Sequence, residues 1–329
     1  MNISVNSVRS SWDIVVTAYE PEPCVLAFIA YHLKIGASEI FLYLDRPGNA
    51  SEKLQRTLSK KTNVYVRICD SEYWSKLMGR RPEHTPQRQT ANAQDAMNKS
   101  KADWLLHCDI DEFVAKDERV FDRLDSAPLT TDSIMLRVAE RVTTQSDPEE
   151  NIYSSTFRRT TPLALDHELV DVYGDFASFL SKNTAGYPTG KSFVRTNQGI
   201  IMGVHEPKGC EGGRAVNQEN LPISSIFHFD GFSQKAFIRK MRIHRENGRR
   251  LPSLAKRALQ VQYLEAHLDD PMALEVFYKG LKMISEDQEA FLWKKGWLMH
   301  HDLDILTHLQ NEFPDSGYKL TIDELVWSS

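Results

Sequence analysis

The stretch Trp104-Leu-Leu-His-Cys-Asp-Ile-Asp-Glu-Phe113 restricts the possible folds of this chain more than any other segment. Its apolar first half is short and comes directly after a segment with a helical pattern. This predicts a buried strand over residues 104–108. Because side chains alternate along a strand, Asp109 and Asp111 would project together at its carboxyl end. In open α/β sheets, ligands bind at this edge.

Two carboxylates held close together repel each other, and burying them is costly unless a cation or another paired group compensates. Mg²⁺ and Mn²⁺ prefer hard oxygen ligands of this kind and commonly bridge to the phosphate groups of a substrate. The alternative is a solvated loop in which Asp111 or Glu112 caps the next helix, and an isolated Asp-x-Asp would favour it. The apolar strand before the two carboxylates and the Glu-Phe after them favour the metal site.

Strands and helices alternate through the first third of the chain. The pattern predicts strands over residues 13–19, 39–44, 63–69 and 104–108, and helices over residues 24–35, 51–60 and 86–101. Gly36 is expected to cap the first of these helices, and Ser51 to begin the second. The order predicts an α/β fold with a doubly wound, mostly parallel sheet and helices on both faces. The strand ends near Glu20, Asp45 and Asp109 would then lie along one edge.

After Phe113 the alternation is less regular. Further strands are predicted over residues 133–142 and 224–229, with a hairpin formed by residues 191–196 and 199–204. The polar segment 143–190 has no clear pattern, and we expect it to form the pocket that recognises the substrates. From Ser233 onward the pattern is helical, with helices predicted over about 253–267, about 271–285 and near the C-terminus. A boundary near Gly231 therefore divides the chain into a catalytic domain, 1–232, and a C-terminal helical extension, 233–329.

Composition excludes several classes of protein. The 329 residues are 41% hydrophobic and carry a net charge of −5, which gives no overall reason to expect nucleic-acid binding. No apolar run approaches the roughly 18 residues that span a bilayer, and the first residues lack the apolar core of a signal peptide, so we expect a cytoplasmic location. Nine Lys and Arg side chains against the single acid Glu246 make residues 235–257 strongly basic. This segment is expected to be a solvated face, or to contact phosphate, an anionic acceptor or a membrane surface.

Two segments carry a resemblance to a known family. The first comprises Val16-Thr-Ala-Tyr-Glu20, Ala30-Tyr-His-Leu-Lys-Ile-Gly36 and Ile40-Phe-Leu-Tyr-Leu-Asp45, in which a strand ends near a Glu, a helix carries Tyr-His and a second strand ends in Asp. The second is Asp103-Trp-Leu-Leu-His-Cys-Asp-Ile-Asp-Glu-Phe113. Together they resemble the GT-A-fold glycosyltransferases, especially the family 2-like and family 92-like proteins. The chain departs from that pattern at Tyr19, where the family usually has Asn, and in the loop after Asp45, which lacks a second Asp.

The resemblance implies transfer of a sugar from a nucleotide-diphosphate donor, a UDP-sugar, to a hydroxyl of a glycan, lipid-linked or other acceptor, with inversion. It also implies Mn²⁺ or Mg²⁺ bound by Asp109, Asp111 and a third ligand from the last strand, for which His228 is the first choice and His205 the competitor. The same comparison implies donor-binding roles for several side chains of the strand ends and nearby helices. These are Thr17, Glu20, Asp45, Arg88, Asn92, Asp109 and Lys235.

An inverting transferase needs a general base for the acceptor hydroxyl. The resemblance implies a carboxylate between the Asp-x-Asp strand and the final metal-ligand strand. Glu206 is our first candidate because it follows a strand and adjoins His205, and Asp171 is the second. Glu168 and Asp175 are the other candidates.

Two other functions fit parts of the pattern. A nucleotidyltransferase also combines a doubly wound sheet with a carboxylate-bound metal, but the turn after the first strand, residues 17–23, contains no glycine for a phosphate loop. A degenerate protein that only binds nucleotide sugars or glycans is the non-enzymatic alternative. The intact pair of Asp109 and Asp111 argues against it.

Overall fold

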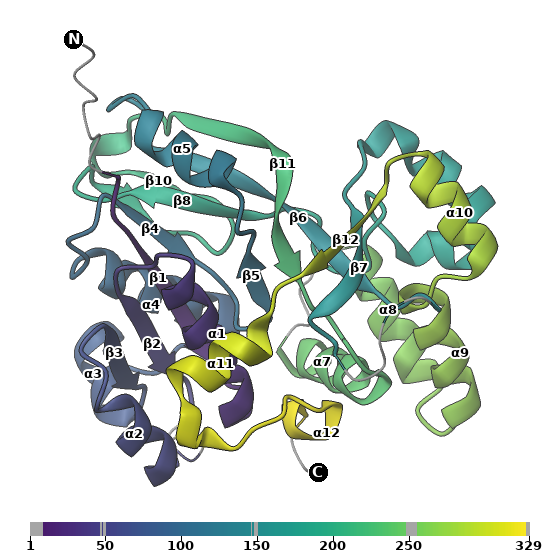
Figure 1. Ribbon diagram of the computed structural model, residues 1–329, viewed down its shortest axis with the longest axis horizontal. Coiled ribbons are helices and arrows are strands. Elements are labelled where there is room, and N and C mark those ends of the chain that lie inside the picture. Colours follow the sequence, from purple (N-terminus) through teal and green to yellow (C-terminus); the bar gives the residue numbers. More distant parts are fainter. Residues whose placement is uncertain are drawn as a thin grey trace.

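The computed structural model describes residues 9–46, 48, 51–145, 147, 151–247 and 255–326. Within them, a single sheet of ten strands forms the centre of the molecule (Figure 1). Eight strands follow the order β12-β7-β6-β8-β4-β1-β2-β3, and β11 pairs with both β5 and β6 outside this row. A second sheet contains only β9 and β10.

One half of the main sheet is parallel and comes from the N-terminal part of the chain. It consists of β1 (Trp12–Ala18), β2 (Ile40–Leu44), β3 (Val64–Ile68) and β4 (Trp104–His107). All three pairings, β1 with β2, β1 with β4 and β2 with β3, are parallel. The predicted α/β class with a doubly wound sheet is confirmed.

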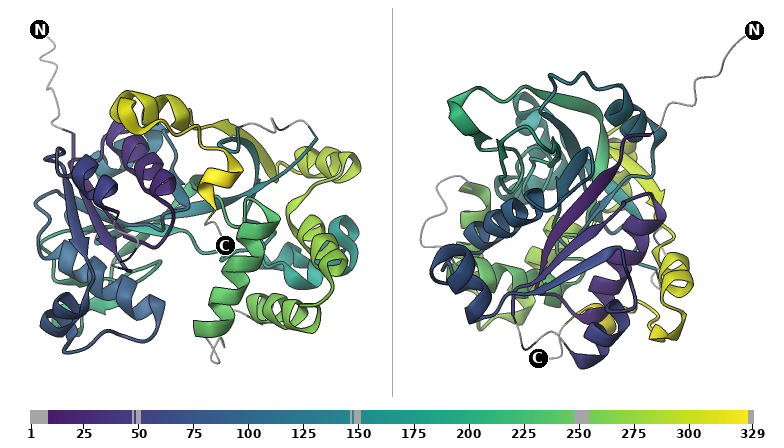
Figure 2. Two further views of the ribbon diagram at one scale, coloured as in Figure 1. Left: turned by 90° about the horizontal axis from the view of Figure 1, so that it is seen from below. Right: turned by 90° about the vertical axis from the view of Figure 1, so that its left-hand side faces the viewer.

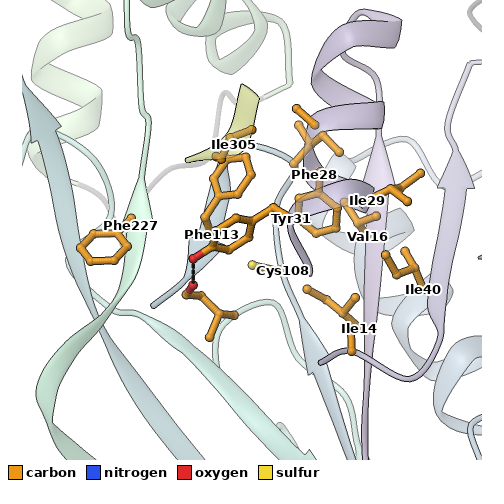
Figure 3. Packing of buried hydrophobic residues seen from close by; sticks show 14 of the residues in the cluster. Ile14, Val16, Phe28, Ile29, Tyr31, Ile40, Cys108, Phe113, Phe227 and Ile305 are labelled. Atoms are coloured by element: carbon orange, nitrogen blue, oxygen red, sulfur yellow. Dashed lines mark hydrogen bonds between the residues drawn. The ribbon is translucent and has the colours of Figure 1, made fainter. Parts of the chain in front are cut away.

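Alternating side chains of β1 and β2 pack against helices on opposite faces. Val16 and Leu42 belong to the core that includes α1 (Glu22–Lys34), whereas Val15 and Phe41 belong to the core that includes α3 (Ser71–Met78) and α4 (Thr85–Met97). Strands buried on both faces need apolar side chains at every position, and this is why the two segments are nearly continuous apolar runs. Figure 3 shows the first core, in which Phe113 lies among side chains of α1, β1 and β2.

The other half of the sheet is largely antiparallel. It consists of β5 (Glu112–Val114), β6 (Ser133–Val142), β7 (Ser154–Arg159), β8 (Lys191–Arg195), β11 (Gln218–His228) and β12 (Leu298–Asp302). The predicted hairpin of residues 191–196 and 199–204 is wrong, because β4 and β6 occupy both edges of β8. The second half of that hairpin forms β9 (Ile200–Ile201), which pairs with β10 (Gly209–Cys210). The pairing of β8 depends on the order of the strands in space. The local pattern of residues along the chain does not contain this order.

A helical layer covers the far end of the antiparallel half (Figure 1). Its elements are η2 (Leu163–Glu168), α6 (Leu169–Tyr173), η3 (Gly174–Phe179), α7 (Gln234–Asn247), α8 (Ala255–Ala266), α9 (Pro271–Lys282) and α10 (Glu286–Lys294). The segment 143–190, which showed no pattern in the sequence, thus contains β7 and three short helices. Phe237 and Met241 of α7 are both buried in this layer.

The last part of the chain returns to the sheet and the first core. β12 pairs antiparallel with β7, and α11 (Ile305–Glu312) packs side by side with α1 (Figure 2). α12 (Ile322–Leu325) also contacts α1. The chain after Gly231 therefore contributes to the helical layer and to the sheet. The remaining short elements are α2 (Glu52–Leu58), α5 (Glu118–Ser126), η4 (Glu211–Gly213) and η5 (Pro314–Ser316).

The sequence predicted local signals better than element boundaries. Ser51 accepts a hydrogen bond from the backbone N–H of Leu54, which confirms it as the N-cap of α2. Gly36 has a φ of 110° directly after α1, as expected for a helix-ending glycine. In contrast, α1 begins at Glu22 rather than Cys24, because proline is tolerated in the first turn of a helix. None of the described helices is long and apolar enough to cross a bilayer.

The buried His32 of α1 should make stability depend on pH. Its Nδ1 lies 2.9 Å from the carbonyl of Phe28, and its Nε2 accepts the backbone N–H of Val114, so only the neutral imidazole satisfies both contacts. Burial lowers the pKa of His32 from 6.5 to about 3. Below pH ~6.5 the His32 imidazole therefore binds a proton in the unfolded chain but stays neutral in the folded chain. The free energy of unfolding falls as pH decreases.

We expect the His32 imidazole to remove about 2 kcal/mol from the free energy of unfolding between pH ~7 and pH ~5. Urea denaturation of wild type and His32→Phe at both values tests this, because the variant should lose less stability on acidification. His167→Phe, which changes an exposed imidazole, is the control. Equal losses in wild type and His32→Phe would contradict the assignment.

Candidate active site

The predicted carboxylate pair lies on the turn between β4 and β5. Because β4 ends at His107, Asp109 and Asp111 are placed by this turn and not by the alternation of a strand. Glu112 is buried as the first residue of β5 and accepts the backbone N–H of Asp109 at 2.9 Å. Phe113 anchors the turn in the core. Glu112 and Phe113 thus fix the turn that carries the two aspartates.

Asp109 faces a buried lysine. The Nζ of Lys191, at the start of β8, donates to Asp109 Oδ2 at 2.8 Å and lies 3.4 Å from Glu112 Oε2. Gln89 of α4 donates to Asp109 Oδ1 at 2.6 Å. Burial by itself would raise the pKa of Asp109, but the Lys191 ammonium outweighs it and lowers this pKa to about 2. Asp109 is therefore held as a carboxylate by two side chains from separate elements.

Asp111 faces a different lysine. The Nζ of Lys240, on α7, donates to Asp111 Oδ2 at 2.8 Å, and His228 Nε2 lies 3.6 Å from the same oxygen. Burial opposes ionisation, but Lys240 and His228 together hold the pKa of Asp111 well below its usual range. The pair that the sequence placed together therefore faces two separate cationic partners.

His228 and Asp230 bring further ligand atoms to Asp111. His228 is the last residue of β11, and Asp230 follows two positions later. Among the described residues, Asp111, His228 and Asp230 form the group of His, Cys, Asp and Glu side chains that could hold a metal ion, with ligand atoms all within 4.8 Å of one another. Carboxylate oxygens are ligands that suit Mn²⁺ and Mg²⁺. Asp109 lies outside this group.

Sequence reasoning did not single out Asp230, although a signal was present. His228 and Asp230 are two residues apart at a strand end, which is the same spacing that drew attention to Asp109 and Asp111. Asp230 is buried and also contacts Arg257 at 3.1 Å and Lys282 at 3.2 Å. Burial opposes ionisation of Asp230, but Lys240, Lys282 and Arg257 together hold its pKa well below its usual range. The contacts with α8 and α9 tie this side of the site to the helical layer.

Thr17 lies near the end of β1, and Glu20 follows just after the strand. Burial raises the pKa of Glu20 to about 7, and the negative charge of Asp111 contributes to the same shift. Thr17 accepts a hydrogen bond from Asn92 at 2.9 Å, and Asn92, which is fully buried, accepts one from Tyr73. Asn92 thus connects α4 to the strand end, and its own side chain has no exposed surface.

Asp45, at the end of β2, is bound by two arginines. Arg88 Nε contacts both of its oxygens, at 2.9 and 3.1 Å, and Arg81 donates to Oδ1 at 2.9 Å. A cavity of about 440 Å³ opens beside Asp45 at the carboxyl ends of β2 and β3. Its lining residues are Asp45, Arg46, Cys69, Asp70, Ser71, Ser75, Gly79, Arg80 and Arg81. Of the predicted residues, Asp45 therefore lies in the wall of this cavity, and Arg88 binds its carboxylate.

Comparison with protein families decides the assignment. The family model described as glycosyltransferase family 92 matches residues 18–262, which is most of the chain and includes Asp109, Asp111, His228 and Asp230. The chain belongs to glycosyltransferase family 92. It is therefore a glycosyltransferase, which decides against the nucleotidyltransferase and the non-enzymatic binding protein.

Several solved structures are similar to this transferase. S. aureus TarS residues 1–349 in complex with UDP is 12% identical, with a TM-score of 0.38, over 92% of this chain and 81% of that one. The same protein in complex with UDP-GlcNAc is 11% identical, with a TM-score of 0.36, over 94% and 93% of the two chains. A CMP:2-keto-3-deoxy-manno-octonic acid synthetase is 17% identical over 42% and 61%, with a TM-score of 0.27. No curated protein matches. Since these TM-scores are low, the assignment rests on the family model.

The candidate bases of the transferase lie on different elements and differ in their local contacts. Glu206 is exposed, and Gln218 Nε2 lies 3.5 Å from its carboxylate. The neighbouring His205 stacks on Tyr187, and burial next to Lys191 lowers the pKa of His205 to about 3. Asp171 is exposed on α6, within the helical layer. Of the other two candidates, Glu168 pairs with Lys295 and Asp175 is exposed.

The basic segment of the transferase is not one uniform surface. Lys235 is exposed on α7, and at five residues before Lys240 it lies about 140° around the helix from that side chain. Other basic side chains have specific partners, and Arg249 and Arg250 lie outside the described residues. These partners are Glu265 for Arg245, the carbonyl of Ser178 for Lys256, Asp230 for Arg257 and the ring of Tyr19 for Arg239.

Proposed function

We propose that this glycosyltransferase moves a sugar from a UDP-sugar to an acceptor hydroxyl, with inversion and with a divalent cation at the Asp111 side of the site. The observation that carries the proposal is the convergence of Asp111, His228 and Asp230 from the β4–β5 turn and the end of β11. A bound Mn²⁺ or Mg²⁺ would neutralise the negative charge that develops on the leaving nucleoside diphosphate. Asp109, predicted as a further ligand, would contribute a second carboxylate from the same turn.

The donor nucleotide would bind along the ends of the parallel strands. The cavity beside Asp45 supports this position for the base and ribose. It opens at the carboxyl ends of β2 and β3, which is the edge of the sheet where ligands bind. Arg88 and Asn92 would orient residues that contact the donor, since Arg88 binds the Asp45 carboxylate and Asn92 donates to Thr17. Lys235 would reach the diphosphate only as an exposed point charge.

Two lysines of the chain would offset the negative charge of the carboxylates, so that an anionic donor can bind. Lys191 keeps Asp109 ionised from one side, and Lys240 keeps Asp111 ionised from the other. Glu20 would lie between the nucleotide and this pair, and its raised pKa of about 7 makes it sensitive to charge nearby. The site would thus carry carboxylates that bind the cation and ammonium groups that attract the diphosphate.

Glu206 remains the first candidate for the general base. The Nζ of Lys191, which binds Asp109, also donates to the carbonyl of Val204 at 3.2 Å, two residues before Glu206. The segment that carries Glu206 is therefore attached to the carboxylate side of the site. Asp171 is exposed on α6, which packs against η2, η3 and α10 in the helical layer. A surface carboxylate near an open site can accept the proton of an incoming hydroxyl.

Calorimetry with UDP, with and without Mn²⁺, tests the proposal. We expect binding that is at least about tenfold tighter with Mn²⁺, because the cation bridges carboxylates and diphosphate. A screen of nucleotide sugars for Mn²⁺-dependent hydrolysis then identifies the donor. Binding of UDP that is indifferent to Mn²⁺ would remove the metal from the proposal, and absence of binding for every nucleotide sugar would remove the donor class.

A further inference from the structure

The ammonium of Lys240 lies at the centre of the proposed metal ligands. Its Nζ is 2.8 Å from Asp111 Oδ2, 2.6 Å from Asp230 Oδ1 and 3.5 Å from His228 Nε2. These are the three side chains whose ligand atoms lie within 4.8 Å of one another. A positive charge of this chain therefore occupies the position at which the three ligand atoms converge.

The geometry around Asp230 is better suited to a metal than to a lysine. Its Oδ1 is buried and accepts no well-directed hydrogen bond, although Lys240 Nζ lies 2.6 Å away. An ammonium binds a carboxylate through three directed N–H donors, whereas a metal ion takes up the oxygen directly as one of its ligands. The contact between Lys240 and Asp230 is thus mainly electrostatic, and one carboxylate oxygen is left without a directed partner.

We propose that Lys240 and a divalent cation compete for one position between Asp111, Asp230 and His228. The inference rests on the proposed function, because it names which side chain must leave when the metal binds. An ammonium nitrogen at 2.6–2.8 Å from two carboxylates leaves no room for a cation that needs the same oxygens at about 2.0–2.6 Å. Lys240 is the internal counter-ion of the site when no metal is bound.

Displacement of the Lys240 ammonium by the cation would leave the rest of the site in place. Lys240 is only partly buried, and its flexible stem allows the ammonium to move while α7 stays in place. Asp230 keeps Arg257 and Lys282 as partners after Lys240 has moved. The ligand group therefore stays assembled, and the released ammonium becomes available to a phosphate group of the donor.

Binding of Mn²⁺ alone, measured by electron paramagnetic resonance of the free ion, tests the competition. Lys240→Met should bind Mn²⁺ roughly tenfold or more tightly than wild type, the factor that corresponds to one charge-assisted hydrogen bond that no longer has to be broken. Arg242→Met removes the same charge from an exposed position of the same helix and should leave the affinity at the wild-type value. Lys240→Gln carries the same expectation if Lys240→Met fails to fold.

A second measurement needs no variant. Acetylation of lysines in the wild-type protein, followed by mass spectrometry, should modify Lys240 more completely with Mn²⁺ than without it, while the buried Lys282 stays unmodified in both. Unchanged or weaker Mn²⁺ binding by both Lys240 variants, or equal acetylation with and without Mn²⁺, overturns the competition. Either result leaves Mn²⁺-dependent UDP binding by wild type as the separate test of the proposed function.

Discussion

Replacing Asp111 by asparagine should abolish Mn²⁺-dependent binding of UDP while the fold stays intact. Asp111 contributes the carboxylate that joins His228 and Asp230 in the ligand group, and asparagine removes its charge without changing its shape. Loss of a charged ligand should weaken the metal-dependent part of binding by about 100-fold or more. Calorimetry with UDP and Mn²⁺ measures this, and circular dichroism checks the fold.

Asp109→Asn is the matched comparison for Asp111→Asn. Both variants remove one carboxylate from the same turn, but Asp109 faces Lys191 and Gln89 and lies outside the ligand group. A smaller loss for Asp109→Asn would assign the metal to Asp111, His228 and Asp230. An equal loss would make Asp109 a ligand as well, as its position in the sequence predicts. Metal-dependent binding that survives in Asp111→Asn would refute the metal position.

Replacing Glu140 by glutamine should cost about 3–5 kcal/mol of the free energy of unfolding, because it leaves buried cations without their counter-ion. Glu140 of β6 accepts from Arg158 Nε at 2.9 Å and lies 3.0 Å from Lys282 Nζ, and all three side chains are buried. It also accepts the backbone N–H groups of Ala185 and Gly186. One carboxylate therefore joins β6, β7, α9 and the loop before β8.

Urea denaturation measures the effect of Glu140→Gln. Glu275→Gln makes the same chemical change in an exposed pair with Lys279 and should cost less than about 0.5 kcal/mol. Burial opposes ionisation of Glu140, but Lys282 and Arg158 lower its pKa from 4.5 to about 2. The stabilisation is thus present above pH ~4.5, and the difference between wild type and variant should shrink as pH falls towards ~2. A difference that is independent of pH would contradict the role of the charge.

The parallel half of the sheet could be predicted from short segments of sequence, because the signals of its strands and helices lie within neighbouring residues. Strands β1, β2 and β4 are apolar runs, and helix signals such as Ser51 act within one turn. The antiparallel half was predicted less well. β8 was assigned to a hairpin because its neighbours in space, β4 and β6, are distant in the chain and leave no mark on its own residues.

The sequence by itself determined that Asp109 and Asp111 follow a buried strand and belong to a glycosyltransferase pattern. Only the tertiary structure decided which groups face them. Lys240 lies 129 residues after Asp111, and Lys191 lies 82 residues after Asp109. No period of a strand or helix connects such positions, since burial and packing of whole layers bring them together. For the same reason Asp230 joined the candidate metal ligands only when β11, the β4–β5 turn and α7 were placed in space.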